Sequence, residues 1–396
     1  MAHILCLAPG AAGHVNPLLG LVTELTDRGH RVSFATTKDY AARVAHAGAE
    51  AVVYHSAVEE SWTADNPPDF TGDALVEILG WGVTETETQL PVLEQAFAGD
   101  QPDLVVYDGM QLLRWVGPLL AQRWGVPSVQ TCPSLVSNEH WSMTDEFVSF
   151  DPTHPGLAAL FGRLGALVAQ REAGFEVSRL FDDSLAARSL VFLPREFQPE
   201  GQTFDDRYRF VGPCLTARAF QGEWEPPNSV RPRVFISLGT AYNHRPEFYR
   251  ACLEAFAGLA IHVVLALGDR VCREALGPVP ANVELHESVP QLSVLEQVDL
   301  FITHAGMGST MEGLHLGVPL LAVPQMAEQR ANAARVQALG LGRQLAPEAV
   351  TAASLREAAL SVLVDAELSL RVADYRKRSQ AAGGAAAAAD TIEELL

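Results

Sequence analysis

The sequence predicts an α/β protein made of two parallel-sheet domains, and three observations lead to this fold class. Short apolar runs alternate with helical patterns along most of the 396 residues. The alternation stops in the polar, proline-containing stretch 215–233 and then starts again. With 48% hydrophobic residues, a chain of this length can build two cores. We therefore expect two similar α/β sandwiches that face each other across a cleft.

In the first half, each element follows from the local pattern. The apolar run His3–Ala8 predicts a strand, and apolar residues at helical spacing after it predict a helix that stops at Gly29. The polar and aromatic stretch Ser56–Gly72 predicts a long loop, and helices are expected up to about Ala187. Further strands are expected at Arg31–Thr36, Ala51–Tyr54, Asp103–Tyr107, Ser128–Thr131, Leu190–Leu193 and Arg209–Val211.

In the second half the same alternation returns. Strands are expected at Val234–Leu238, His262–Leu267, Val283–His286, Leu300–Thr303 and Leu320–Val323. The alanine-rich tail predicts a final helix that Gly383-Gly384 bends. The expected domains are therefore 1–214 and 234–378, with a linker at 215–233 between them and a C-terminal helix at 379–396 that can pack back on the first domain.

Composition excludes several classes of protein. The net charge of −20 argues against nucleic acid as a partner, because such proteins present a basic surface. The five cysteines are widely spaced and form no CxxC pair, so neither a disulfide framework nor a zinc site is expected. The chain shows no signal-peptide pattern and no apolar run of about 18 residues. We expect a cytoplasmic protein, monomeric or homodimeric, that does not enter membranes.

The stretch Ser288–Gln329 predicts a nucleotide-diphosphate site. A strand at Leu300–Thr303 ends in His304-Ala-Gly-Met-Gly-Ser-Thr and leads into a helix. The small residues Gly306, Gly308 and Ser309 allow the helix start to present bare amides, where an anionic phosphate is favoured.

Two residues of the first half are candidates for acid–base chemistry. His14 follows the first strand, and an imidazole there can accept a proton from a hydroxyl group. Its alternative role is to cap the following helix or to contact phosphate. Asp108 ends another expected strand and can hold the imidazole in one tautomer, or can simply be a helix N-cap.

Motifs along nearly the whole chain resemble those of one enzyme family. They are GHVNP at Gly13–Pro17, YHS at Tyr54–Ser56, PDLVVYD at Pro102–Asp108, FVGP at Phe210–Pro213, SLGTA at Ser237–Ala241, VPQLSVL at Val289–Leu295, HAGMGSTMEGL from His304, and VPQMAEQ ending at Gln329. In this order and spacing, they resemble the nucleotide-sugar glycosyltransferases of the GT-B fold, specifically the bacterial macrolide glycosyltransferases.

The resemblance implies roles for individual residues. It implies that His14 is the general base and Asp108 its partner. It implies that His304, Ser237, Thr240 and the amides around Gly306, Gly308, Ser309 and Thr310 bind the diphosphate. Glu312 resembles the residue that accepts a ribose hydroxyl, and Glu328 and Gln329 resemble the pair that holds the sugar. Without the family, turn chemistry explains Ser237 and Thr240, a helix-dipole partner explains Glu312, and a solvated helix start explains Glu328.

Two positions depart from many members of that family. Ser288 stands where many have a Trp that stacks on the base, so base recognition is expected to involve the backbone around Val289. Glu328 stands where many have Asp, a change that can alter sugar preference. Because some glucose-using bacterial members share both residues, UDP-glucose is the expected donor. Acceptor binding is expected among aromatic residues of the first domain: Trp62, Phe70, Trp81, Trp141, Phe147 and Phe150.

The expected reaction is direct displacement at the anomeric carbon, with inversion and without a metal or other cofactor. A hydroxyl of a hydrophobic acceptor, such as a macrolide, attacks as His14 takes its proton. A TDP-deoxysugar-dependent transferase is the first alternative, and a non-transferring epimerase or binding protein of the same fold is the second. A dinucleotide-dependent oxidoreductase or a serine hydrolase would need GxGxxG or GxSxG, and both motifs are missing.

Overall fold

The computed structural model describes residues 1–61, 72–110, 114–147, 151–215, 222–227, 231–240 and 243–396, which form two compact units. Unit 1 comprises Met1–Thr216 and Ala382–Leu396, and unit 2 comprises Ala217–Ala381. The chain therefore passes from one unit to the other twice. Each unit is built around one parallel sheet. Among the described residues, no helix is both long and apolar enough to span a bilayer.

The sheet of unit 1 has the strand order β3-β2-β1-β4-β5-β6-β7. Its strands are β1 (His3–Leu7), β2 (Arg31–Thr36), β3 (Glu50–Val53), β4 (Leu104–Asp108), β5 (Ser128–Cys132), β6 (Arg188–Val191) and β7 (Tyr208–Phe210). The main helices around it are α1 (Ala12–Asp27), α2 (Lys38–His46), α4 (Gly72–Ala96), α5 (Val116–Trp124), α7 (Pro155–Gln170) and α14 (Gly384–Glu393). The chain starts in the middle of the sheet, at β1, and builds outward first on one side and then on the other.

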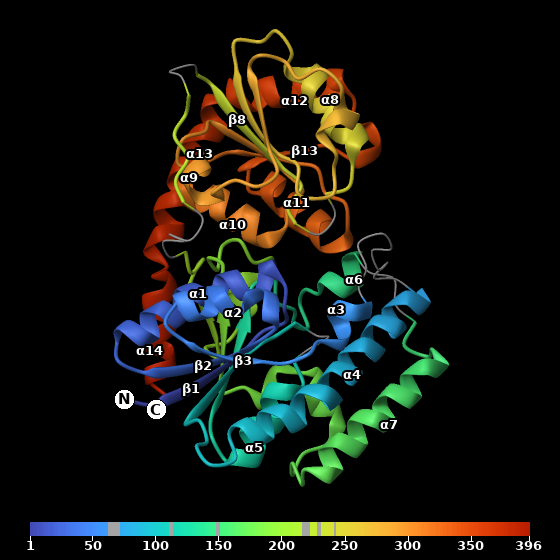
Figure 1. Cartoon of the computed structure of the whole chain (residues 1–396), viewed down its shortest axis with the longest axis vertical. Coiled ribbons are helices and arrows are strands. Elements are labelled where there is room, and N and C mark those ends of the chain that lie inside the picture. The colour runs from blue at the N-terminus through green and yellow to red at the C-terminus, as the bar shows by residue number, and fades with distance from the viewer. Residues whose placement is uncertain (62–71, 111–113, 148–150, 216–221, 228–230, 241–242) are drawn as a thin grey trace. The chain divides into compact units, whose positions relative to one another are not determined.

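Helices cover both faces of this sheet, so alternate residues of a strand enter different cores. On β1, Ile4 and Cys6 pack into the cluster that contains residues of α1 and α14. Leu5 and Leu7 pack into the cluster that contains residues of α4, α5 and α7. Figure 1 shows α4, α5 and α7 on the side of the sheet away from α1 and α2. Burial on both faces explains why these strands are continuous apolar runs.

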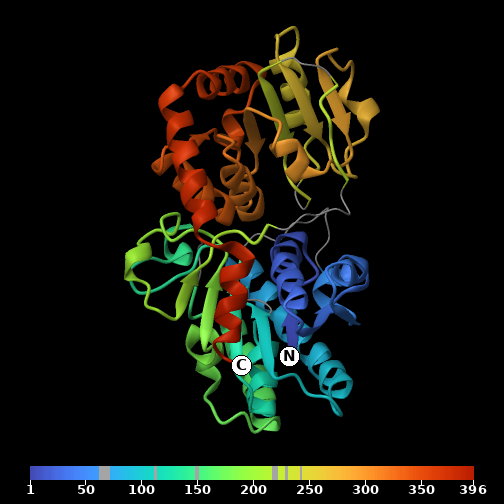
Figure 2. The same ribbon diagram turned by 90° about the vertical axis from the view of Figure 1, so that its left-hand side faces the viewer.

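The last helix, α14, belongs to unit 1 although the residues before it belong to unit 2. Helix α13 (Ala366–Ala381) ends two residues before Gly383, whose φ of 94° ends helical geometry, and α14 begins at Gly384. Ala388 and Ile392 of α14 are fully buried in the α1 core. Figure 2 shows α14, in red, within the same unit as the N-terminus of the chain.

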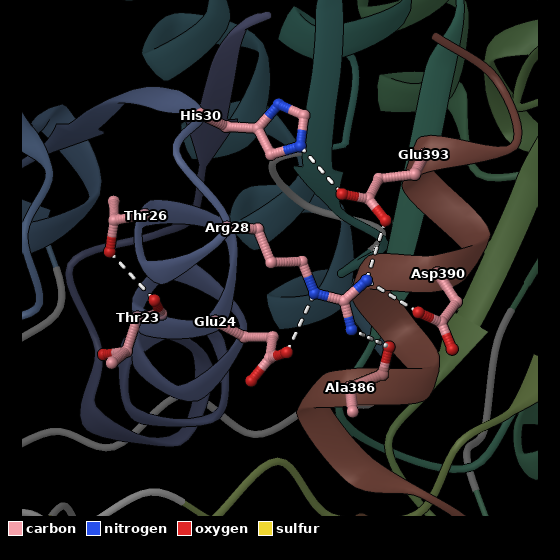
Figure 3. A network of polar contacts seen from close by, with 8 residues as sticks. All are labelled: Thr23, Glu24, Thr26, Arg28, His30, Ala386, Asp390 and Glu393. Atoms are coloured by element: carbon pink, nitrogen blue, oxygen red, sulfur yellow. Dashed lines mark hydrogen bonds and ion pairs between the residues drawn. The ribbon is translucent and has the colours of Figure 1, made fainter. Parts of the chain in front are cut away.

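A charged network also attaches α14 to the end of α1 (Figure 3). The guanidinium Nη1 of Arg28 lies 2.6 Å from Asp390 Oδ1 and 2.7 Å from Glu393 Oε2. Its Nε lies 2.8 Å from Glu24 Oε1, and the imidazole Nε2 of His30 lies 3.0 Å from Glu393 Oε1. These polar contacts add to the buried apolar contact of the two helices, so α14 is held by both burial and charge.

The sheet of unit 2 has the strand order β10-β9-β8-β11-β12-β13. Its strands are β8 (Arg233–Ser237), β9 (His262–Ala266), β10 (Val283–His286), β11 (Leu300–Thr303), β12 (Leu320–Ala322) and β13 (Gly342–Gln344). Its helices besides α13 are α8 (Pro246–Phe256), α9 (Gln291–Leu295), α10 (Met307–Leu316), α11 (Ala327–Ala338) and α12 (Ala352–Leu363). Again the first strand lies inside the sheet, with β9 and β11 as its neighbours.

Two local expectations were wrong. The short helix α3 (Ala57–Ser61) lies in the stretch expected to be a loop, because the carboxylate of Glu85 on α4 accepts hydrogen bonds from its first amides, at 2.6 Å from Ala57 N and 3.2 Å from Val58 N. The helical region after Pro155 ends at Gln170, and only short 3₁₀ turns follow. Within the expected linker, Trp224 belongs to unit 2, and its backbone N–H donates to Ser293 Oγ at 2.9 Å.

Candidate functional site

In unit 1, the direction in which the chain builds the sheet changes between β1 and β4. The chain leaves β1 toward β2, and later leaves β4 toward β5 on the other side. At such a point the two following loops diverge at the carboxyl ends of neighbouring strands and leave room for a ligand. His14 lies in the first turn of α1, directly after β1, and Asp108 is the last residue of β4. The topology thus brings the two candidate residues to one place.

His14 and Asp108 form a direct hydrogen bond. The Nδ1 atom of His14 lies 2.9 Å from Oδ2 of Asp108, and their side chains are 21% and 2% exposed. The other carboxylate oxygen, Oδ1, accepts the Met110 backbone N–H at 2.7 Å. A carboxylate accepts but does not donate hydrogen bonds, so Nδ1 of His14 carries the proton and the lone pair lies on Nε2. The pair therefore presents a basic nitrogen in a fixed orientation.

Unit 2 has an equivalent point between β8 and β11, and here His304 occupies a narrow slot. A Cβ atom on Gly239, in the loop after β8, would lie 2.5 Å from Cε1 of His304, and one on Gly306 would lie 2.5 Å from its Nε2. Gly239 has φ = 76°, and its N–H donates to Ser237 Oγ at 3.1 Å. Only glycine fits at both positions without moving the ring.

The surroundings of His304 favour a neutral ring. Burial lowers the pKa of His304 to about 4, although a hydrogen bond to the Ser237 carbonyl acts in the opposite direction. At neutral pH this imidazole is therefore a neutral hydrogen-bonding group and carries no positive charge. Charge attraction for an anion must come from the backbone nearby.

The start of helix α10 offers that attraction. Its N-cap is Gly306, which has no side chain to cap the first amides, and its first turn contains no acidic residue. A Cβ on Gly308 would meet no atom within 4 Å, so open space adjoins this turn. Exposed N–H groups at a helix start bind anions. The side chain of Thr310, in contrast, is fully buried, because it lies on the face of α10 that packs inward with Met307, Met311 and Leu314. The expected contact of its backbone amide with the donor stays a prediction.

Glu312 is held by a residue that the sequence reasoning missed. Gln291, at the start of α9, lies with its Nε2 2.6 Å from Glu312 Oε2 and 3.4 Å from Ser309 Oγ. Glu312 is 4% exposed. Gln291 stands in the VPQLSVL motif three residues after Ser288, so its motif membership was the signal that could have identified it.

Glu328 and Gln329 begin helix α11 and are each oriented by a neighbour. The amide Nδ2 of Asn332, one turn later, donates to Glu328 Oε1 at 3.0 Å. The Gln325 backbone N–H donates to Gln329 Oε1 at 2.9 Å. Because the amide oxygen of Gln329 is engaged, its NH₂ group is the part suited to donate to a sugar hydroxyl. Asn332 was also missed by the sequence reasoning.

The other residues expected at the site differ in how far they are exposed to solvent. Ser288 and Thr240 are exposed, and Val289 is half-buried. Trp81 on α4 is half-buried, whereas Trp141 is only 8% exposed and can offer little surface to a ligand. Trp62, Phe70 and Phe150 lie outside the described residues, as does the side chain of Phe147 at the end of α6 (Met143–Phe147). Within the described part of the chain, no three His, Cys, Asp or Glu residues are grouped so that they could hold a metal ion.

The chain matches two family models and is similar to known glycosyltransferases in sequence and in structure. Residues 250–395 match the family model of the erythromycin biosynthesis protein CIII-like C-terminal domain, and residues 13–181 match that of the glycosyl transferase 4-like domain. The chain is 41% identical to the demethyllactenocin mycarosyltransferase of Streptomyces fradiae, covering 100% of this chain and 87% of that one. It is 40% identical to the NDP-glycosyltransferase YjiC of Bacillus licheniformis, covering 100% and 98%. The crystal structure of the calicheamicin glycosyltransferase has a TM-score of 0.88 and 37% identity, covering 100% and 98%.

Proposed function

Because the chain belongs to the bacterial macrolide glycosyltransferases, natural-product glycosyltransferases with the GT-B fold, we propose that it transfers glucose from UDP-glucose to a hydroxyl of a hydrophobic natural product. The observation that carries the transfer chemistry is the 2.9 Å hydrogen bond between His14 and Asp108. An acid partner on Nδ1 leaves Nε2 as the base, which is what deprotonation of an acceptor hydroxyl requires.

On the acceptor side, the proposed step is a proton transfer coupled to attack. The acceptor oxygen forms a bond to the anomeric carbon of the sugar while its proton moves to Nε2 of His14. Asp108 stabilises the imidazolium that results, since its Oδ2 already accepts the Nδ1 proton. The Met110 N–H on Oδ1 keeps the carboxylate in the plane that this contact needs.

On the donor side, the bond from the anomeric carbon to the diphosphate oxygen breaks, and negative charge grows on the leaving group. We assign the amides at the start of α10 and the neutral ring of His304 to this charge. Glu312, oriented by Gln291, is assigned to the ribose hydroxyls, and Glu328 and Gln329 to the sugar. In this proposal the protein supplies the electrostatic stabilisation itself, and no metal ion takes part.

Attack on one side of the anomeric carbon and departure on the other invert its configuration. An α-linked nucleotide sugar would then give a β-linked product. The one-bond carbon–proton coupling at the anomeric position of the product distinguishes the two outcomes by NMR, and an α-linked product would overturn the single-displacement mechanism.

A TDP-deoxysugar is the second candidate donor, and the Streptomyces fradiae relative, named for mycarosyl transfer, is the reason to keep it. Ser288, exposed at the position where a stacking ring would read the base, is also compatible with a thymine base. The test is a panel of macrolide, aromatic polyketide and phenolic acceptors incubated with UDP-glucose or TDP-glucose, with products identified by mass spectrometry. A donor preference for TDP-glucose of tenfold or more would reject UDP-glucose as the natural donor, where tenfold corresponds to about 1.4 kcal/mol.

A further inference from the structure

We propose that Asn332 is a positioning residue that joins the two parts of the donor site, the diphosphate-binding turn and the sugar-binding carboxylate. The proposal rests on the donor site assigned above and goes beyond it, because Asn332 touches neither phosphate nor sugar in that assignment. Asn332 lies in α11 and is fully buried. Its single NH₂ group donates to two acceptors, the backbone carbonyl of Ala305 at 2.9 Å and Glu328 Oε1 at 3.0 Å.

The first acceptor belongs to a strained turn. Ala305, between His304 and Gly306, has φ = 61°, a left-handed conformation that is unfavourable for a residue with a Cβ atom. Such a conformation persists only where surrounding contacts enforce it. Two of them are hydrogen bonds at Ala305 itself: its N–H donates to Thr303 Oγ1 at 3.2 Å, and its carbonyl accepts from Asn332. This turn sets the direction of the first amides of α10, so Asn332 acts on the diphosphate site through Ala305.

The second acceptor is the carboxylate assigned to the sugar. One oxygen of Glu328 is held by Asn332, the same side chain that binds the carbonyl of Ala305 in the turn. A change at position 332 therefore acts on both parts of the donor site at once. One NH₂ group can serve both partners because it carries two hydrogens, one for the carbonyl and one for the carboxylate.

The oxygen of the Asn332 side chain indicates that this residue is not present for stability alone. Its Oδ1 is buried and has no hydrogen-bond partner among the described residues. A buried polar atom without a partner costs stability, and an apolar side chain of similar size would avoid that cost. The donor contacts of the NH₂ group are what an apolar residue could not replace.

The test uses N332L and the double variant A305G/N332L, with titration calorimetry of UDP and of UDP-glucose. N332L removes both donor contacts, so UDP should bind about five- to tenfold more weakly. Its preference for UDP-glucose over UDP-galactose in kcat/KM should fall by a similar factor. In the double variant, glycine adopts the left-handed turn without help, so UDP affinity should return to within about twofold of the wild type while donor preference stays lost. The coupling would be rejected if the double variant recovered both UDP affinity and donor preference. It would also be rejected if N332L bound UDP as tightly as the wild type and kept its donor preference.

A matched control is Asn282, whose Nδ2 also donates to two acceptors, the carbonyls of Phe256 at 3.0 Å and Ile261 at 2.8 Å. N282L should lower the melting temperature without changing donor preference, whereas an equal loss of preference would show that the effect of N332L is only structural. N332A serves if N332L does not fold, because alanine also lacks the donor and adds no bulk to the buried position.

Hydrogen exchange of the ligand-free protein tests the positioning role of Asn332 independently of which nucleotide sugar is the donor. In N332L the amides from Ala305 to Met307 should exchange faster than in the wild type, and those around Asn282 should not. Unchanged exchange at the turn would refute the positioning role even if UDP-glucose were confirmed as the donor. Faster exchange would support it even if another nucleotide sugar proved to be the substrate.

Discussion

The Nδ1 atom of His14 and the Oδ2 atom of Asp108 are 2.9 Å apart although 94 positions separate the two residues in the chain. Both lie at carboxyl ends of adjacent strands, where the sheet changes its direction of growth. The pair links the topology of unit 1 to its proposed chemistry, since the contact leaves Nε2 of His14 as the basic atom.

Replacement of His14 by alanine should remove the base while leaving the donor site intact. We expect transfer to a hydroxyl acceptor to fall by a factor of about 10² to 10⁴. The affinity for UDP should stay within about twofold, because His14 belongs to unit 1 and the proposed donor residues belong to unit 2. Initial rates with saturating acceptor and calorimetry with UDP measure the two quantities. Full activity of H14A would show that another group is the base.

D108N should lower kcat without unfolding the protein. The amide can present its NH₂ group to Nδ1 and so favour the wrong tautomer of His14. D103N is the matched control, because Asp103 Oδ2 also accepts a hydrogen bond, from the His3 N–H at 2.7 Å, but lies just before β4 and not at its carboxyl end. We expect D103N to reduce the melting temperature with little change in kcat. Equal kcat in D108N and the wild type would remove Asp108 from the mechanism.

G239A should disturb the slot of His304. Gly239 has φ = 76°, and a Cβ there would lie 2.5 Å from the ring, so the substitution adds a clash to an unfavourable backbone conformation. Together these cost about 2–4 kcal/mol of unfolding free energy. Gly258 has φ = 74° with no atom within 4 Å of a Cβ, so G258A should cost only about 1 kcal/mol and leave UDP binding unchanged. Chemical denaturation and calorimetry compare the two variants.

The lowered pKa of His304 predicts a pH dependence of stability. Between pH 6.5 and about 4, the unfolded chain binds a proton at this ring and the folded chain does not. The contribution of His304 is therefore fully present above pH 6.5 and is lost as the pH falls through this window. In H304N the fall of melting temperature from pH 6.5 to 4.5 should be shallower than in the wild type. H244N, at an exposed position of the same unit, should leave the slope unchanged.

R28M should loosen the C-terminal helix. Arg28 contacts Asp390, Glu393 and the Ala386 carbonyl of α14, so its loss should weaken the attachment by about 1 kcal/mol, and less at high salt. Hydrogen exchange in α14 should become faster at low ionic strength. R378M is the control, because Arg378 pairs with Asp374 within α13 itself. If α14 exchanged equally in both variants, apolar packing alone would hold the helix.

Much of the fold could be predicted from the sequence because buried parallel strands are apolar runs of recognisable length. The expected strands agree with those observed to within a few residues, from β1 to β12. The exceptions depend on distant contacts. Helix α3 starts where the carboxylate of Glu85 accepts hydrogen bonds from its first amides, and the backbone N–H of Trp224 donates to Ser293, a distant residue of unit 2. Neither contact can be predicted from the residues next to it in the sequence.

The sequence by itself determined the alternation of strands and helices, the helix start after His304, and the histidine and carboxylate after two strands, because these follow from local periodicity and residue type. Only the tertiary structure decided which side chains meet. It joined Gln291 to Glu312, and Asn332 to both Ala305 and Glu328, and it gave the expected pair of His14 and Asp108 its direct hydrogen bond. The physical reason is that strand order and helix packing set these contacts, and sequence separation carries no information about either.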